Sequence, residues 1–190
     1  TELMYNPPAE NTFEFVELHN DSPDTTLDIG GVTFTQGIDY TFASGTTLPP
    51  DGYLVLAKSS DLAAFRAYYG LADTIPVVGP YEGSLNNAGE TLTLRSASGG
   101  VDLLRFTYGN GRAWPLSADG AGHSLIPKAS ALATEAEGSL DYPDNWTASV
   151  YLNGSPGRGE PEPVASVVIA NSTAVCSSGE IGRASCRERV

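Results

Sequence analysis

The side chains that could carry out chemistry are few and widely spaced. His19 and His123 are the only histidines, and His123 precedes Ser124 in a chain rich in acids, which suggests a Ser-His-Asp hydrolase as one alternative. The serine of such an enzyme commonly sits in a Gly-x-Ser-x-Gly turn, which this sequence lacks, and Ser124 falls inside a strand-like run. We therefore predict no catalytic residue and interpret His123 as a strand residue beside a turn.

Metal ligands are equally sparse. Two separated histidines and one cysteine near the C-terminus do not supply the usual zinc ligands. Calcium is favoured more than zinc because it takes oxygen ligands from acidic loops, but no acidic group has the spacing of an EF-hand loop. Asp in loops also bonds nearby amides, so we predict no metal site and no cofactor, with weak calcium binding left open. The aspartates concerned form two groups: Asp21, Asp24 and Asp28, and Asp141 and Asp144.

Aromatic residues and one acid offer further candidates. Trp114 and Trp146 could stack on sugar rings, but each follows a turn-rich segment where a large anchor is needed, so we predict packing. The same alternatives apply to Tyr68-Tyr69 and Tyr81. Glu17 lies in a strand motif, and we expect it to fix a neighbouring turn, because the sequence places no second carboxylate beside it.

The net charge of the chain is −13. Such a surface repels phosphate backbones and anionic headgroups, which argues against nucleic acid or a membrane surface as partner. No apolar run approaches the ~20 residues needed to cross a bilayer, so we expect no membrane insertion.

Both ends of the sequence are unusual. Residues 181–190 read IGRASCRERV, the translation of a DNA sequence that resembles a common sequencing adapter, so we expect this tail to be read-through. Without this tail Cys186 is excluded, so Cys176 has no partner for an internal disulfide. The net charge becomes −15 once the tail is removed. The start at Thr1, without an initiator methionine, suggests an internal fragment of a longer protein.

Short alternating runs separated by turn residues predict an all-β sandwich. In Glu90–Arg95, Leu92 and Leu94 should face the core. One exception, Ser60–Gly70, has a helical pattern, with Ser60 as the predicted cap and Gly70 as the C-terminal stop. Asp51-Gly52, Asn110-Gly111, Asp119-Gly120 and Asn153-Gly154 predict tight turns with positive φ. The predicted strands are Leu3–Tyr5, Phe13–Asn20, Val32–Phe34, Tyr40–Phe42, Tyr53–Ala57, Glu90–Arg95, Asp102–Tyr108, His123–Ile126 and Trp146–Ser149.

The composition also predicts the domain organisation. Residues 1–159 have the length of one domain, and prolines and glycines then indicate a linker over 160–166. Residues 167–180 are interpreted as the truncated start of a following domain, and residues 181–190 as the adapter read-through.

Several sequence motifs follow one another in a characteristic order: 13–20 (FEFVELHN), 27–31 (LDIGG), 42–48 (FASGTTL), 52–56 (GYLVL), 83–90 (GSLNNAGE), 114–115 (WP), 120–125 (GAGHSL), 145–146 (NW) and 154–157 (GSPG). Together they resemble the lamin tail domain, in the version found in bacterial secreted multidomain proteins. The resemblance covers nearly all of residues 1–159. Val32 departs from the pattern, which often has Trp after the glycine pair and so a different core contact there.

The resemblance implies an immunoglobulin-like β-sandwich without catalytic activity, carrying one short inserted helix. It also implies a structural or interaction module in a secreted or cell-surface bacterial multidomain protein. The expected partner is an unknown protein or surface glycan, together with flanking domains of the same chain. One alternative is a carbohydrate- or calcium-dependent adhesion module. Another is an accessory domain of an extracellular hydrolase or nuclease whose catalytic domain lies outside this sequence.

Overall fold

The computed structural model describes residues 1–129 and 139–161. The contacts divide the chain into Thr1–Glu160 and Pro161–Val190, and only the first unit is described below. Most of the predicted linker, the predicted second domain, the adapter-like tail and both cysteines lie outside the described residues, so those interpretations stay predictions.

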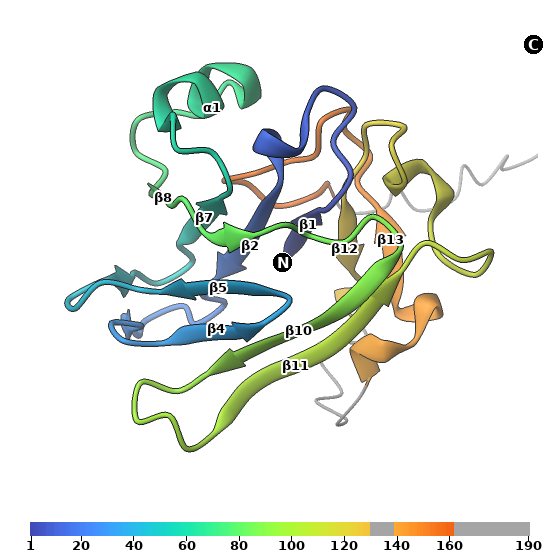
Figure 1. Ribbon diagram of the computed structural model, residues 1–190. Coiled ribbons are helices and arrows are strands. Elements are labelled where there is room, and N and C mark those ends of the chain that lie inside the picture. The colour runs from blue at the N-terminus through green and yellow to red at the C-terminus, as the bar shows by residue number, and fades with distance from the viewer. Residues whose placement is uncertain (130–138, 162–190) are drawn as a thin grey trace, which may run out of the picture. The chain divides into compact units, whose positions relative to one another are not determined.

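One sheet has six strands in the order β13-β12-β1-β2-β7-β8 (Figure 1). All its pairings are antiparallel except that of β7 with β8, which follows the helix and is parallel. Glu2 lies directly opposite Glu17 in the register of β1 and β2. The strands are β1 (Glu2–Met4), β2 (Phe15–His19), β7 (Tyr53–Ala57), β8 (Val77–Val78), β12 (Leu125–Pro127) and β13 (Trp146–Ala148).

The second sheet has five strands in the order β11-β10-β4-β5-β9, and β3 (Leu27–Asp28) pairs with β6 (Thr47–Leu48) as a separate ribbon. The hairpin of β10 and β11 is its longest part (Figure 1). The strands are β4 (Thr33–Gln36), β5 (Ile38–Thr41), β9 (Glu82–Gly83), β10 (Gly89–Arg95) and β11 (Asp102–Gly109). The predicted all-β, immunoglobulin-like sandwich with one short helix is confirmed.

Alternation along the strands fills the space between the sheets. Leu54 and Leu56 of β7 join the main core, and the predicted inward residues Leu92 and Leu94 of β10 do the same. Burial of such side chains contributes about 1.5–3 kcal/mol each. Other core members are Leu3, Tyr5, Val16, Val32, Phe34, Phe106, Tyr108, Leu125 and Trp146.

A second apolar cluster lies on the other face of the six-stranded sheet, under α1 (Leu62–Tyr69). Phe65 of α1 packs there against Phe15, Val55 and Ala57. Gly70 ends the helix in the left-handed conformation as predicted. The predicted cap at Ser60 is wrong, because Asp61 Oδ1 accepts from Ala64 N at 2.9 Å and leaves Asp61 as the capping residue.

Several strand boundaries differ from the predicted ones by one or more residues. Phe13 belongs to a 3-10 turn, η1 (Asn11–Phe13), rather than to β2, and His123 precedes β12. The short strands β3, β6, β8 and β9 had no predicted counterpart, because two-residue pairings depend on neighbours distant in sequence. The remaining 3-10 turns are η2 (Leu116–Ala118), η3 (Ser139–Asp141) and η4 (Pro143–Asn145).

Three of the four predicted turn dipeptides contain a residue with positive φ, and Asn153 and Gly154 both do. The prediction is wrong for Asn110-Gly111, where neither residue has positive φ. The tight turn there is made by a hydrogen bond from Trp114 N to Gly111 O instead.

Candidate functional site

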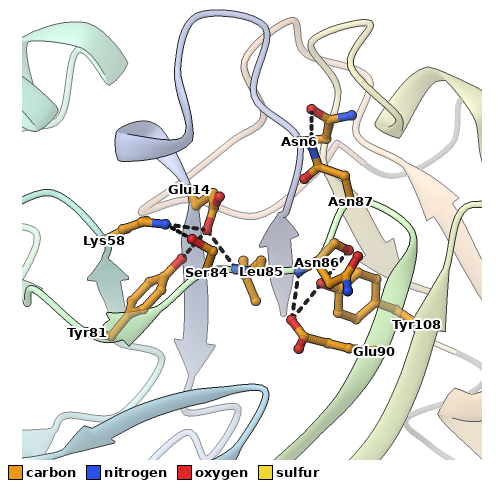
Figure 2. A network of polar contacts seen from close by, with 10 residues as sticks. All are labelled: Asn6, Glu14, Lys58, Tyr81, Ser84, Leu85, Asn86, Asn87, Glu90 and Tyr108. Carbon is orange, nitrogen blue, oxygen red and sulfur yellow. Dashed lines mark hydrogen bonds and ion pairs between the residues drawn. The ribbon is translucent and has the colours of Figure 1, made fainter.

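Glu14 is the buried centre of a polar cluster between the two sheets (Figure 2). It lies in the chain between η1 and β2, and its side chain has no exposed surface. Glu14 Oε2 accepts hydrogen bonds from Tyr81 Oη at 2.9 Å and from Leu85 N at 2.8 Å. Lys58 Nζ lies 3.8 Å from the same oxygen and donates to Ser84 Oγ. One carboxylate therefore holds the segment that leads from β9 to β10.

The electrostatics of this cluster are those of a buried anion with partial compensation. Burial raises the pKa of Glu14, while the hydrogen bonds from Leu85 and Tyr81 and the charge of Lys58 act in the opposite direction. Glu14 Oε1 has no hydrogen-bond partner among the described residues. Tyr81 is buried too, and burial next to Glu14 raises the pKa of its phenol. A neutral phenol therefore serves as a fixed donor to Glu14.

Further hydrogen bonds near β10 hold the segment that leads from β9 to β10. Glu90 Oε1 accepts from Asn86 N at 2.8 Å, and Tyr108 Oη lies 3.1 Å from it. Asn87 Nδ2 donates to Asn6 Oδ1 at 3.1 Å, which ties the segment to the chain after β1. Figure 2 shows both groups along one stretch of backbone. These contacts position a loop, and they place no nucleophile beside a base.

A second buried acidic cluster lies at the start of the chain, where β1 and β2 meet the segment Gly154–Glu160, which we call the strap. Glu2 and Glu17 are both buried. Glu2 Oε1 accepts from Ser124 Oγ at 2.5 Å and from Ser155 N at 2.8 Å. Glu17 Oε2 accepts from Gly157 N at 2.5 Å, as expected of an acid that fixes a neighbouring turn.

Burial and the neighbouring Glu17 raise the pKa of Glu2 to about 7. Burial also raises the pKa of Glu17, against the effects of the Thr1 ammonium group and of the hydrogen bond from Gly157. A pocket of about 110 Å³ borders this cluster, and Tyr53 and Arg158 are among its lining residues. The two carboxyl groups can therefore hold a proton near neutral pH.

Each histidine and Ser124 has a different hydrogen-bond partner, and no hydrogen bond among the described residues joins a histidine to the Ser124 hydroxyl. His19 stacks on Tyr53 with ring centroids 4.2 Å apart, and its Nε2 lies 3.2 Å from Asp51 Oδ1. His123 Nδ1 lies 2.8 Å from the carbonyl oxygen of Ser149. The Ser124 hydroxyl donates to Glu2, so it is used structurally.

Four of the five aspartates that could offer calcium ligands accept hydrogen bonds from other groups of the chain. Asp28 Oδ1 accepts from Gly30 N at 2.9 Å, and Asp24 Oδ1 accepts from Thr25 Oγ1 at 2.8 Å. Asp141 Oδ1 accepts from Thr107 N at 2.5 Å, and the Asp144 carbonyl oxygen accepts from Lys128 Nζ at 2.6 Å. Within residues 1–129 and 139–161, no group of three or more His, Cys, Asp or Glu side chains is arranged to hold a metal ion.

The aromatic candidates pack as predicted. Trp146 is buried, and its Nε1 donates to Leu140 O at 2.8 Å. Trp114 is partly buried against the core, with its ring centroid 6.0 Å from that of Trp146. Tyr68 stacks on Phe13, and Tyr69 Oη donates to Phe13 O at 2.6 Å.

Sequence reasoning missed Glu2, Glu14 and Glu160 and found Glu17 without its carboxylate neighbour. Glu2 faces Glu17 only through the register of β1 and β2, which is a tertiary property. A signal for buried acids was present, because residues 1–57 contain nine acidic residues and no Lys or Arg. Acids inside apolar strand motifs without nearby cations need backbone or hydroxyl donors if they are buried.

Residues 1–110 match the Lamin Tail Domain family. The chain belongs to the lamin tail domain family. The lamin tail domain is a non-catalytic module with an immunoglobulin-like fold, which agrees with a cluster that anchors loops. No curated protein and no solved structure matches the chain.

Proposed function

We propose that this lamin tail domain is a non-catalytic interaction module of a secreted or cell-surface bacterial multidomain protein. The family supports a structural or interaction role. The buried acids add support, because Glu2, Glu14 and Glu17 are bonded to loop amides and hydroxyls. Polar chemistry in the described interior thus maintains the shape of the domain, and binding falls to its surface.

The observation that carries this proposal is the outer edge of β11. β11 ends the order of the five-stranded sheet, so no strand of the described residues pairs with that edge. Val101 and Leu103 beside it are 59% and 55% exposed. Proteins usually protect long edge strands, because unpaired backbone groups pair with other chains.

The backbone of β11 shows which part of the edge is free. Thr107 N points outward, since it donates to Asp141 Oδ1 of η3. Alternate residues of a strand direct their N–H and C=O groups to the same edge, so Arg105 presents its groups beside Thr107. Among the described residues, Asp141 accepts the outward-pointing donor of Thr107, and we infer that the apolar end of β11 receives a protein partner that adds an extended segment.

A binding experiment on bacterial cells tests the proposal. The fluorescently labelled chain is titrated onto cells and onto isolated cell envelopes, with bound label measured by flow cytometry. Leu103→Lys should weaken binding about tenfold, because a charge is placed on the apolar part of the edge. Thr35→Lys is the matched control, since Thr35 is exposed on β4 inside the same sheet, and it should bind like wild type.

The alternatives give different results in the same design. Binding that is unchanged in Leu103→Lys, or absent for wild type, contradicts the protein-interaction proposal. Binding abolished by a soluble glycan indicates a carbohydrate module, and binding abolished by EDTA indicates calcium-dependent adhesion. Turnover of chromogenic ester, glycoside or nucleotide substrates by the purified chain contradicts a non-catalytic role.

A further inference from the structure

The strap is attached to the six-stranded sheet mainly by carboxyl groups. Its residues Ser155 and Gly157 bond Glu2 and Glu17, which lie opposite one another on β1 and β2. Two like charges directly opposite on adjacent strands repel each other, and burial strengthens the repulsion. Closure of the strap therefore depends on how much negative charge this site carries.

Ser155 connects Glu2 to a third carboxyl group. Its Oγ lies 3.1 Å from Glu2 Oε2 and 2.7 Å from Glu160 Oε1. A serine hydroxyl has one hydrogen, so it donates to only one of two carboxylates at a time. Both contacts are hydrogen bonds only when one carboxyl group carries a proton.

The hydrogen-bond donors around Glu2 and Glu160 indicate which of the two carboxyl groups carries the proton. Glu160 Oε1 also accepts from Ser149 Oγ, and Glu160 Oε2 accepts from Val150 N at 3.0 Å. Glu2 Oε1 already accepts two hydrogen bonds, whereas Glu2 Oε2 has Ser155 Oγ as its hydrogen-bond partner. The consistent arrangement has a proton on Glu2 Oε2 that is donated to Ser155, whose own proton goes to Glu160.

The charged and titratable groups near Glu2 set how tightly the proton is held. The charge of Glu17 on β2 raises the affinity of Glu2 for a proton, and the Thr1 ammonium group lies close to both acids. The charge of Glu2 also contributes to raising the pKa of Tyr69 of α1. Arg158, Tyr53 and Glu160 line the adjoining pocket, and the Arg158 guanidinium lies 4.0 Å from the centroid of the Tyr151 ring.

We propose that the strap is a proton-dependent clasp, closed when Glu2 and Glu160 share a proton through Ser155 and released when that proton is lost. The pKa of about 7 for Glu2 supports the geometry. Because this value exceeds the ordinary 4.5, the proton stabilises the folded strap fully below pH ~4.5, and the stabilisation is lost as pH rises through 7.

Trypsin reports the state of the strap, because Arg158 is exposed within it. Cleavage after Arg158 is measured by mass spectrometry at pH 6.0 and 8.5, relative to a free peptide of residues 151–161. We expect the relative rate to rise about tenfold at the higher pH, since cleavage follows the population of the open strap. Glu2→Gln, whose amide donates to Ser155 like the protonated acid, should remove the rise.

Glu10→Gln is the matched control, because Glu10 is an exposed acid outside the cluster, and it should keep the wild-type rise. A rate ratio independent of pH in wild type, or an equal rise in Glu2→Gln, overturns the proposal. If Glu2→Gln does not fold, hydrogen exchange at Ser155 N and Gly157 N of wild type decides. Protection that falls between pH 6.0 and 8.5, after correction for intrinsic exchange, supports the clasp, and constant protection overturns it.

Discussion

Replacement of Glu14 by alanine tests whether one buried carboxylate holds the segment between β9 and β10. Glu14→Ala removes the acceptor of Leu85 N and Tyr81 Oη, both at buried positions. A buried donor without a partner costs about 1–3 kcal/mol. The Lys58 side chain is 20% exposed, so its ammonium group can reach water and adds little. We expect the free energy of unfolding to fall by about 2–6 kcal/mol, because two buried donors lose their acceptor.

Two further variants are compared with Glu14→Ala, one that removes only the charge and one that serves as a control. Glu14→Gln keeps an acceptor for Leu85 and removes the charge, so it should cost about 1–2 kcal/mol. Glu82→Gln is the matched control, because Glu82 is an exposed acid on neighbouring β9. It should stay within about 0.5 kcal/mol of wild type.

Urea unfolding followed by tryptophan fluorescence measures all three, since Trp114 and Trp146 report on the core of the same unit. The dependence on urea concentration should stay constant if only stability changes. A Glu14→Ala variant as stable as Glu82→Gln would refute the assignment of Glu14 as the anchor of this segment.

Three other changes have defined outcomes. Trp146→Ala should destabilise by about 3–5 kcal/mol, because it empties a buried aromatic site and leaves Leu140 O without its donor, whereas equal stability in urea would show that the site is dispensable. Calcium at 5 mM should raise the free energy of unfolding by no more than about 1 kcal/mol, the effect of a millimolar site, since a micromolar site would add about 5 kcal/mol; a larger increase that Asp24→Ala removes contradicts the prediction of no metal site. Deletion of residues 181–190 should leave Tm unchanged in calorimetry, and a loss of several degrees would show that this tail is part of the fold.

The long strands were predictable because their patterns are local. Alternation in β10 identifies Leu92 and Leu94 as core residues before any partner strand is known, and both are core members. The helix was predictable for the same reason, since its apolar spacing and Gly70 lie within one short segment. Short strands such as β8 were not, because two residues form a strand only when a neighbouring strand offers its edge.

The polar clusters needed information that local patterns lack. Glu17 was recognisable as a turn anchor, yet its neighbour Glu2 depends on how β1 pairs with β2. Glu14 lies between Phe13 and Phe15, and a sequence interpretation that places both in the main core directs Glu14 to solvent. Both phenylalanines belong instead to the cluster under α1, so alternation directs Glu14 to the opposite face. Its burial follows from Tyr81 and Leu85, about 70 residues later in the chain, supplying donors.

The two buried acidic clusters show that part of the acidic composition does not contribute to the surface charge. Residues 1–57 have nine acids and no Lys or Arg, a composition that by itself suggests a strongly negative surface that repels anionic partners. Glu2, Glu14 and Glu17 are buried, however, and their main partners are amides and hydroxyls of loops. Since burial and the neighbouring Glu17 raise the pKa of Glu2 to about 7, the formal charge of −13 overstates the negative charge near neutral pH. The proposed partner at the β11 edge would therefore meet a less repulsive surface than the composition implies.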